Sequence, residues 1–297
     1  MRLNLNLKQV LESSGISQNS LAKSIGVSPS AISQYLKDAY KGDVPALEVR
    51  LREFLSIHTE REATAAPTSS QVVETRSMLE ICAVLRRATL DRDMTMATGE
   101  SGIGKTTALR EYHRRNPTTI LIEADPGYTA RALSVELCEQ LGLDTRGTIH
   151  DLLKRMISKL SGSGRLIIID EAEHLPLRCL ELIRRVHDKA EVAVALVGMP
   201  RLKTNLQGDP NYFAQLYKRI GFHRPLASLT DKDVKALVTA RIGAVDADVL
   251  SALRKACQSN ARTLVKLLRQ CLELMRLNEC GIDPEIVASA ELAVVIV

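Results

Sequence analysis

The spacing of apolar residues changes along the chain, and these changes predict its domain organisation. Residues 1–56 carry short apolar patterns of helical spacing. Residues 57–70 lack apolar periodicity and predict a linker. Between residues 71 and 228, apolar runs alternate with amphipathic patterns, and the pattern in 229–297 is helical only. We therefore expect an N-terminal domain, a linker, a central domain and a helical C-terminal domain, in that order.

Apolar runs in the middle region predict the strands of a parallel sheet. The runs are Met94–Thr98, Thr119–Ile122, Leu166–Asp170 and Val192–Val197. Each is continuously apolar and precedes a helical pattern, which is typical of strands that are covered on both faces. The C-terminal region has helix-start signals at Thr230, Asp246, Asn260 and Asp283. The expected fold is an α/β core with a helical C-terminal domain.

Composition narrows the class of protein. The hydrophobic fraction of 45% and the charged fraction of 25% are ordinary for a globular protein. Aromatic residues make up 3% of the chain, and tryptophan is absent from the sequence. This argues against a protein that stacks the bases of single-stranded nucleic acid on aromatic side chains. The net charge of +5 permits a nucleic-acid partner without establishing one.

Cysteine spacing and apolar run length bear on where the protein works. The six cysteines form no C-x-x-C pair, so we expect reduced thiols and neither disulfides nor a zinc site. No basic start leads into an apolar run, and no stretch reaches the roughly 20 apolar residues of a membrane span. We expect a cytoplasmic protein without a membrane partner.

The segment Gly99-Glu-Ser-Gly-Ile-Gly-Lys-Thr fits the phosphate-binding pattern G-x-x-x-x-G-K-[ST] between a predicted strand and a predicted helix. Its glycines allow backbone N–H groups to surround phosphate oxygens. Lys105 would reach the β- and γ-phosphates, and the Thr106 hydroxyl would bind Mg²⁺. The expected cofactors are ATP and Mg²⁺. The residues expected to contact the nucleotide are Gly99, Glu100, Ser101, Gly102, Ile103, Gly104, Lys105, Thr106 and Thr107.

Two acidic residues follow the strand predicted at Leu166–Asp170. Asp170 ends this strand, and Glu171 comes next. Carboxyl ends of parallel strands share one edge, so both carboxylates would face the phosphate loop. We expect Asp170 to hold Mg²⁺ and Glu171 to polarise the attacking water.

The N-terminal region predicts a helix, a turn and a second helix between Gln18 and Lys37. Gly26 permits the turn, and Ser28 is a helix cap followed by Pro29. This segment resembles lambda-repressor-type helix-turn-helix domains, which place the second helix in the major groove. The residues expected to contact DNA are Ser28, Ser30, Ser33, Gln34 and Lys37.

The charge of this module is weak for a DNA reader. Residues 1–55 carry seven Lys and Arg against five Asp and Glu, a net charge of 7 − 5 = +2. A small helical bundle used for protein contacts therefore stays open as an alternative.

The order of the nucleotide motifs resembles the AAA+ ATPases. That resemblance implies an arginine finger, for which Arg219 is the candidate on a helix in Gln215–Ile220, with Lys218 and Arg201 as competitors. It also implies that Arg262, which opens a helix of the C-terminal lid, reaches the γ-phosphate. The polar residue that many AAA+ proteins carry after the fourth strand is absent, because Gly198 and Met199 stand there.

Together with the helix-turn-helix, the segment Ile-Ile-Ile-Asp-Glu-Ala-Glu-His at 167–174 resembles the transposition protein B family of Mu-like bacteriophages. The resemblance spans nearly the whole chain. It implies an ATPase of the bacterial host cytoplasm that binds double-stranded DNA largely without sequence preference. It also implies an ATP-dependent filament or ring of identical subunits, a transposase partner and ATP hydrolysis stimulated by DNA and the transposase. In this family Val73 and Thr75 would lie near adenine, and Thr129, Arg131 and Lys154 would contact DNA.

Other functions remain open at this point. One is a helicase loader or replication initiator of the same class of ATPase. Another is an ATP-gated transcriptional regulator whose helix-turn-helix reads an operator. The regulator would bind one sequence as a discrete dimer, whereas the transposition ATPase would bind many sequences and grow along DNA.

Overall fold

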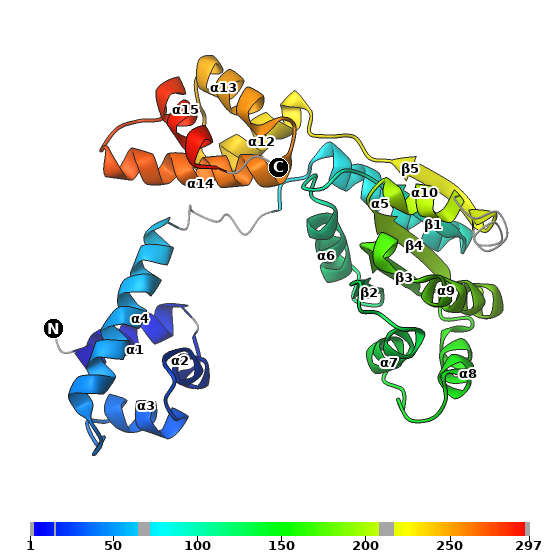
Figure 1. Cartoon of the computed structure of the whole chain (residues 1–297), viewed down its shortest axis with the longest axis horizontal. Coiled ribbons are helices and arrows are strands. Elements are labelled where there is room, and N and C mark those ends of the chain that lie inside the picture. The colour runs from blue at the N-terminus through cyan, green and yellow to red at the C-terminus, as the bar shows by residue number, and fades with distance from the viewer. Residues whose placement is uncertain (1–2, 15, 65–71, 208–216, 295–297) are drawn as a thin grey trace. The chain divides into compact units, whose positions relative to one another are not determined.

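The fold is described here from a computed structural model, which describes residues 3–14, 16–64, 72–207 and 217–294. The chain divides into two compact units, Met1–Pro67 and Thr68–Val297 (Figure 1). The first is all-helical, and the second holds a sheet with helices.

The N-terminal unit is a small helical bundle. Its helices are α1 (Leu3–Ser14), α2 (Gln18–Ile25), α3 (Pro29–Leu36) and α4 (Val44–Thr64). Ser17 caps α2, Gly26 ends it in the left-handed conformation at φ 68°, and Ser28 caps α3. The predicted helix-turn-helix is therefore present. Its core is formed by Leu7, Leu21, Ala22, Ile32, Tyr35, Leu36, Leu47, Leu51 and Leu55.

Helix α4 extends further than the sequence predicts. It runs to Thr64, so the first part of the expected linker 57–70 is helical. The reason is that Glu60-Arg-Glu-Ala63 consists of strong helix formers, which continue a helix without any apolar face. Residues 65–70 of the expected linker lie outside the described residues.

The second unit is built on a five-stranded parallel sheet with strand order β2-β3-β4-β1-β5. The strands are β1 (Met94–Thr98), β2 (Ile120–Glu123), β3 (Leu166–Asp170), β4 (Ala193–Gly198) and β5 (Ile220–Pro225). The predicted strands and the α/β class are confirmed. The sequence does not predict β5, because this half-exposed edge strand contains glycine, histidine and proline.

Helices cover both faces of this sheet. They are α5 (Arg76–Asp91), α6 (Lys105–Arg115), α7 (Ala130–Gln140), α8 (Ile149–Leu160), α9 (Leu177–Ala190) and α10 (Arg201–Gln207), with a 3-10 turn η1 (Ala172–His174) after β3. Side chains alternate between the faces, as in any strand. Ile167 and Ile169 pack with α7, α8 and α9, whereas Ile168 packs with α5 and α6.

The lid consists of helices with a core of their own. They are α12 (Asp231–Ile242), α13 (Ala247–Cys257), α14 (Ala261–Leu277) and α15 (Pro284–Ala293). The predicted starts are confirmed, since Thr230, Asp246, Asn260 and Asp283 are the N-cap residues. Val238, Leu253, Leu264 and Leu267 lie in the lid core.

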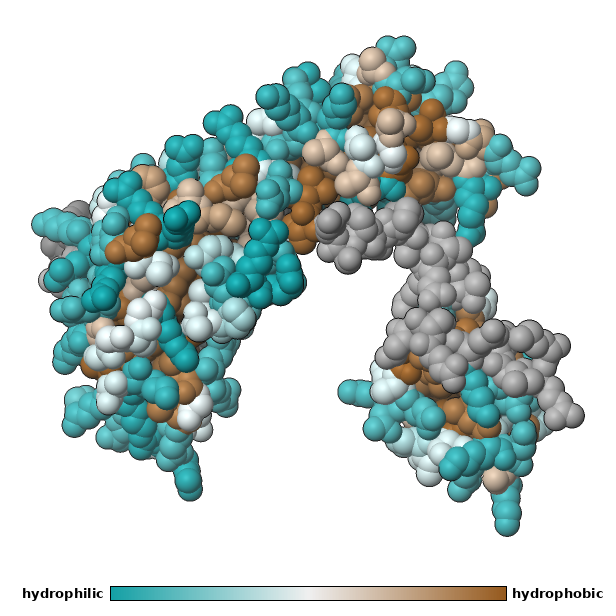
Figure 2. All heavy atoms as spheres, turned by 180° about the vertical axis from the view of Figure 1, so that it is seen from behind, coloured by the Kyte–Doolittle hydropathy of each residue, from teal (hydrophilic) through white to brown (hydrophobic). Residues whose placement is uncertain are grey.

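Hydrophilic side chains cover most of the surface of both units in the view of Figure 2, with hydrophobic ones showing between them. Within the described residues, no helix combines the length and hydropathy that crossing a bilayer requires.

Asp233 joins the lid to the start of α5. Its buried carboxylate accepts hydrogen bonds from Thr230 N at 2.8 Å, Thr230 Oγ1 at 2.7 Å and Arg76 N at 2.8 Å. Each hydrogen bond to a charged group contributes on the order of 1.5–3 kcal/mol. This one carboxylate therefore both caps α12 and fixes the lid to the core.

We expect Asp233→Ala to lower the free energy of unfolding by about 2 kcal/mol or more, because it leaves backbone donors unpaired. Asp231→Ala is the matched control: Asp231 pairs with Arg254 on the surface, where ion pairs contribute about 0–1 kcal/mol. Urea denaturation followed by circular dichroism measures both. Equal effects of the two variants would contradict this role of Asp233.

Candidate functional site

The phosphate loop leaves β1 at Thr98 and enters α6 at Lys105. Gly102 and Gly104 adopt left-handed backbone at φ 81° and 96°, which other residues adopt only with strain. Gly104 caps α6 without a side chain, so the first N–H groups of that helix stay open to an anion. The loop is built to hold phosphate.

Lys105 reaches back over this loop. Its Nζ donates to the carbonyls of Gly99 at 2.7 Å and Glu100 at 2.8 Å. Burial lowers the pKa of Lys105, and the nearby carboxylates, first of Glu173 and then of Asp170, act against that shift. The ammonium thus sits among acidic groups at the point where phosphates would enter.

Asp170 ends β3 and is 1% exposed. Its Oδ1 accepts the Glu171 N–H at 2.9 Å, and its Oδ2 is buried with no hydrogen-bond partner in the described part of the chain. Burial raises the pKa of Asp170, outweighing the lowering by the Thr106 hydroxyl and the Glu171 N–H. An unpartnered carboxylate oxygen beside a hydroxyl fits a hard cation such as Mg²⁺, which keeps waters and binds phosphates.

Glu171 begins the turn after β3 with a left-handed backbone at φ 49°. Such strained positions in non-glycine residues cluster at functional sites. Its carboxylate faces the cleft, together with Glu173 and His174 from η1. Glu173 and His174 were not predicted. For His174 the sequence holds a signal, because it follows Glu171 by three residues and a single turn of 3-10 helix places residues three apart on one face.

The lid is docked directly on the phosphate loop. Asn260 Nδ2 donates to Ser101 O at 2.9 Å, and Arg262 N donates to Gly102 O at 3.0 Å. A β-carbon at position 102 would collide with the Asn260 side chain. Gly102 is therefore needed for its backbone angle and also for this close approach.

A cleft of about 420 Å³ lies between the loop and the lid. Ser101, Gly102, Gly104, Lys105, Thr106 and Thr107 line its floor. Met199 follows β4, and Arg241, Arg262, Lys266 and Arg269 come from the lid. The cations at 262, 266 and 269 recur at helical spacing on α14, so the sequence holds a signal for them beyond Arg262. The cleft combines backbone donors and cations on two sides, as a polyphosphate requires.

Other predicted nucleotide residues lie near this cleft without lining it in the described structure. Thr75 is buried and caps α5, and its hydroxyl shares a hydrogen bond with Ser77 at 3.1 Å. Ser77 Oγ in turn donates to Ile103 O at 3.0 Å. Val73 is half-buried just before this cap. Both predicted residues thus belong to the segment that supports the phosphate loop, and an adenine contact stays a prediction.

Arg219 does not lie on a helix, so that expectation is wrong. It occupies a turn directly before β5, the edge strand of the sheet; residues 215–216 lie outside the described residues. Its Nε is 3.3 Å from Asp188 Oδ1, and the side chain is 56% exposed. Since Ile220 pairs with Met94 at the start of β1, Arg219 sits at the sheet end opposite the phosphate loop.

The N-terminal unit presents the predicted recognition surface. Ser28, Ser30, Gln34 and Lys37 are exposed, and Ser33 is half-exposed. The Ser28 hydroxyl accepts the Ala31 N–H at 3.2 Å and shares a hydrogen bond with Ser30 at 2.9 Å. These two hydroxyls are therefore engaged in capping, whereas Gln34 and Lys37 project outward.

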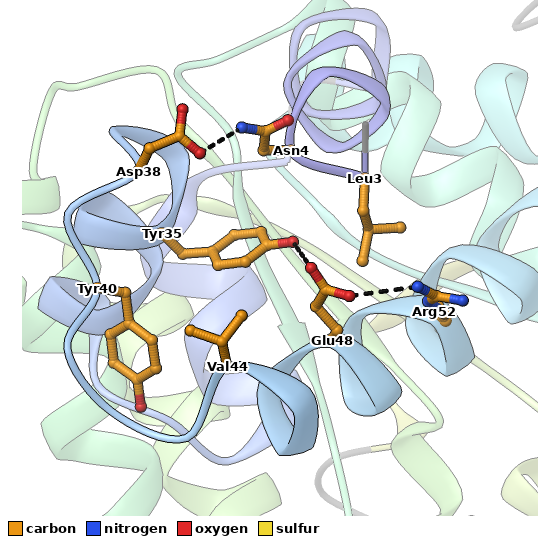
Figure 3. Close-up of a pocket in the computed structure, with 8 residues that line it drawn as sticks. All are labelled: Leu3, Asn4, Tyr35, Asp38, Tyr40, Val44, Glu48 and Arg52. Atoms are coloured by element: carbon orange, nitrogen blue, oxygen red, sulfur yellow. Dashed lines mark hydrogen bonds and ion pairs between the residues drawn. The ribbon is translucent and has the colours of Figure 1, made fainter. Parts of the chain in front are cut away.

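A buried tyrosine fixes α3 against α4. Figure 3 shows Tyr35 pointing at Glu48, which also faces Arg52. The Tyr35 hydroxyl donates to Glu48 at 2.9 Å, and Arg52 donates to the same carboxylate at 3.2 Å. Burial, followed by the hydrogen bond to Glu48, raises the pKa of Tyr35 to about 12. Helix α3 is thus held on its inner side by a polar contact in addition to its apolar core.

The residues of the second unit that were predicted to contact DNA differ in whether their side chains already make contacts within the protein. Thr129 caps α7, accepting the Ala132 N–H at 3.1 Å. Arg131 donates to the carbonyls of Gly147 and Thr145, so its guanidinium holds the loop between α7 and α8. Lys154 is exposed on α8. Of these three, Lys154 has the side chain most available to a phosphate.

Comparison with known sequences matches both units. The AAA domain family matches residues 88–206, and the helix-turn-helix family matches residues 7–43. Mu-like prophage FluMu DNA transposition protein B of Haemophilus influenzae is 31% identical over 81% of this chain and 85% of its own. The ATP-dependent target DNA activator B of Escherichia phage Mu is 29% identical over 79% of this chain and 76% of its own.

Comparison with solved structures shows the fold. The Aeropyrum pernix ORC2 protein superimposes with a TM-score of 0.59 at 18% identity, covering 78% of this chain and 71% of its own. Domain III of the Thermotoga maritima replication initiation protein DnaA gives 0.51 at 15% identity, covering 74% of this chain and 92% of its own. At these identities the likeness concerns architecture alone.

We expect Lys105→Ala to abolish nucleotide binding, because this ammonium is the charge that the loop directs at the β- and γ-phosphates. Arg110→Ala is the control on the same helix, since Arg110 is paired with Glu123 on the surface. Titration with a fluorescent ATP analogue measures both. Unchanged affinity in folded Lys105→Ala protein would rule out this loop as the nucleotide site.

Proposed function

This chain belongs to the transposition protein B family of Mu-like phages and prophages, and from that membership we propose that it is an ATP-dependent activator of target DNA in transposition. The observation that carries the proposal is the pairing of a helix-turn-helix unit with an AAA domain whose phosphate loop, Asp170 and Glu171 line one edge of the sheet. The relative at 31% identity is named a DNA transposition protein, and the one at 29% identity is named an ATP-dependent target DNA activator.

ATP would lie in the cleft between the phosphate loop and the lid. Backbone N–H groups of the loop and Lys105 would bind the β- and γ-phosphates, and Arg262 would approach the γ-phosphate from the lid. Mg²⁺ would be held by Thr106 and Asp170 and would neutralise phosphate charge. Glu171, at the carboxyl end of β3, would accept a proton from the attacking water.

DNA would be bound largely without sequence preference. The recognition surface has one candidate base reader, Gln34, which can hydrogen-bond adenine, and Lys37 would supply a phosphate contact. Lys154 adds a cation on the ATPase unit. With few base contacts available, phosphate contacts would dominate affinity, and binding would weaken steeply with salt. A transposase would receive the DNA and stimulate hydrolysis.

Hydrolysis would require assembly of identical subunits. Arg219 lies before β5, and the five residues of β1 separate that sheet end from the phosphate loop by about 16 Å at ~3.3 Å per residue. Arg219 therefore cannot reach the nucleotide of its own chain. It can act as an arginine finger for a neighbour, and such head-to-tail contacts close into a ring or continue as a helix.

Glu171→Gln tests the proposed function. It removes the water-polarising carboxylate but leaves Asp170 intact, so we expect ATP binding to persist and hydrolysis to fall by about 100-fold or more. Dissociation from DNA should slow on two duplexes of unrelated sequence. Phosphate release and DNA dissociation are the measurements, with Glu139→Gln, at an exposed position of α7, as control.

Wild-type turnover in Glu171→Gln would remove Glu171 from the mechanism. A preference of roughly a thousandfold for one duplex would instead favour an operator-reading regulator.

Mixing two inactive variants tests the finger in trans. We expect Arg219→Ala and Lys105→Ala to be inactive separately, since a finger contributes about 10³-fold or more in rate. Mixed, they should recover part of the activity, because some interfaces pair an intact loop with an intact Arg219. Lys218→Ala is the neighbouring control. A mixture that co-assembles by light scattering and stays inactive would show that Arg219 is not the finger.

A further inference from the structure

A line of polar side chains runs from the cleft to the start of α10. His174 Nδ1 lies 3.3 Å from Glu171 Oε2. On the other side of the ring, Arg201 Nη2 donates a hydrogen bond to His174 Nε2. His174 therefore stands between the carboxylate that faces the cleft and a cation behind it.

The contact with Arg201 decides where the His174 ring carries its proton. A guanidinium donates hydrogen bonds and cannot accept them, so Nε2 must present its lone pair. A neutral ring in that arrangement carries its proton on Nδ1, the atom nearest Glu171. Nδ1 is buried and makes no hydrogen bond in the described part of the chain. It is a donor that the Glu171 carboxylate can satisfy through a small rotation.

Arg201 is itself held in place by Glu173. The Glu173 side chain is 2% exposed, and its Oε1 lies 3.8 Å from Arg201 Nη2. Its carboxylate fills the space that a side chain at position 198 would occupy, since a β-carbon on Gly198 would collide with Oε2. Cations compensate for the burial of this carboxylate, and Arg201, beside the turn after β3, is one of them, together with Lys105.

We propose that His174 is a positioning residue, oriented by Arg201, that donates a hydrogen bond from Nδ1 to Glu171 and aims its carboxylate at the attacking water. This inference rests on the proposed ATPase function and deepens it. It also assigns Arg201 to the site of its own chain, which removes it as a competitor of Arg219 for the finger. The left-handed φ of Glu171 agrees with a functional role for this turn, because strained backbone positions cluster at functional sites.

Two substitutions of His174 separate the contacts of its two nitrogens. His174→Asn keeps an amide donor at the position of Nδ1, and His174→Gln places its amide at the position of Nε2. With full-length protein and saturating DNA, we expect His174→Ala and His174→Gln to lower kcat by about 10- to 100-fold, the cost of a misplaced catalytic group. His174→Asn should restore most of the rate. The dissociation constant of a fluorescent ATP analogue should stay unchanged throughout.

A second measurement does not depend on hydrolysis. Nitrogen-15 chemical shifts of the His174 ring, identified by its loss in His174→Asn, should show the proton on Nδ1 in the unliganded protein. Arg201→Ala should move the proton toward Nε2, whereas Arg201→Lys should keep it on Nδ1. Arg178→Ala, an exposed arginine on the adjacent α9, should leave the ring unchanged.

The outcomes distinguish this inference from the proposed function. Full hydrolysis by Glu171→Gln would overturn the function. If Glu171→Gln is inactive while His174→Ala keeps the wild-type kcat, the ATPase stands and the positioning role is wrong. Equal rates for the Asn and Gln variants, or a ring proton on Nε2 in the wild-type protein, would also overturn the inference.

Discussion

The arrangement of this protein depends on a parallel sheet that is buried on both faces. Its strands pair in parallel, so the ends that carry chemistry lie at one edge and the opposite ends at the other. The strand order separates β1 from β3 by β4, which places the phosphate loop across one strand from Asp170. The same rule puts Arg219 at the far edge. Strand direction alone therefore separates Arg219 from the phosphate loop of its own chain.

Three loops that follow β1, β3 and β4 are tied together at the active edge. The loop after β1 accepts hydrogen bonds from the lid, and Gly99 N donates to Gly198 O at the end of β4. The turn after β3 contacts the start of α10 through His174 and Arg201. The site is therefore a network of hydrogen bonds in which each loop limits the movement of the next.

Much of the fold and of the candidate site could be predicted from the sequence, wherever neighbouring residues in the chain determine the structure. Four strands are continuous apolar runs, and the lid helices begin at capping residues that satisfy their own backbone donors. Strand β5 is not predicted because Ile-Gly-Phe-His-Arg-Pro carries no apolar run and takes its place at the sheet edge by pairing with β1. Glu171 and Lys105 belong to contiguous motifs. Asn260, 159 residues beyond Ser101, becomes part of the site only through tertiary packing, which local spacing does not encode.

The docking of Asn260 and Arg262 on the phosphate loop has a thermodynamic consequence. The peptide groups that hold the lid belong to the loop that would hold the nucleotide. The free energy of lid docking is therefore coupled to the free energy of nucleotide binding. Linkage is reciprocal: whatever factor nucleotide adds to the stability of the docked lid, the docked lid adds to nucleotide affinity. A cavity cut in the lid core at Leu267, whose side chain is fully buried on α14, would thus be felt as weaker nucleotide binding. Residues that never meet the ligand would help to set its dissociation constant.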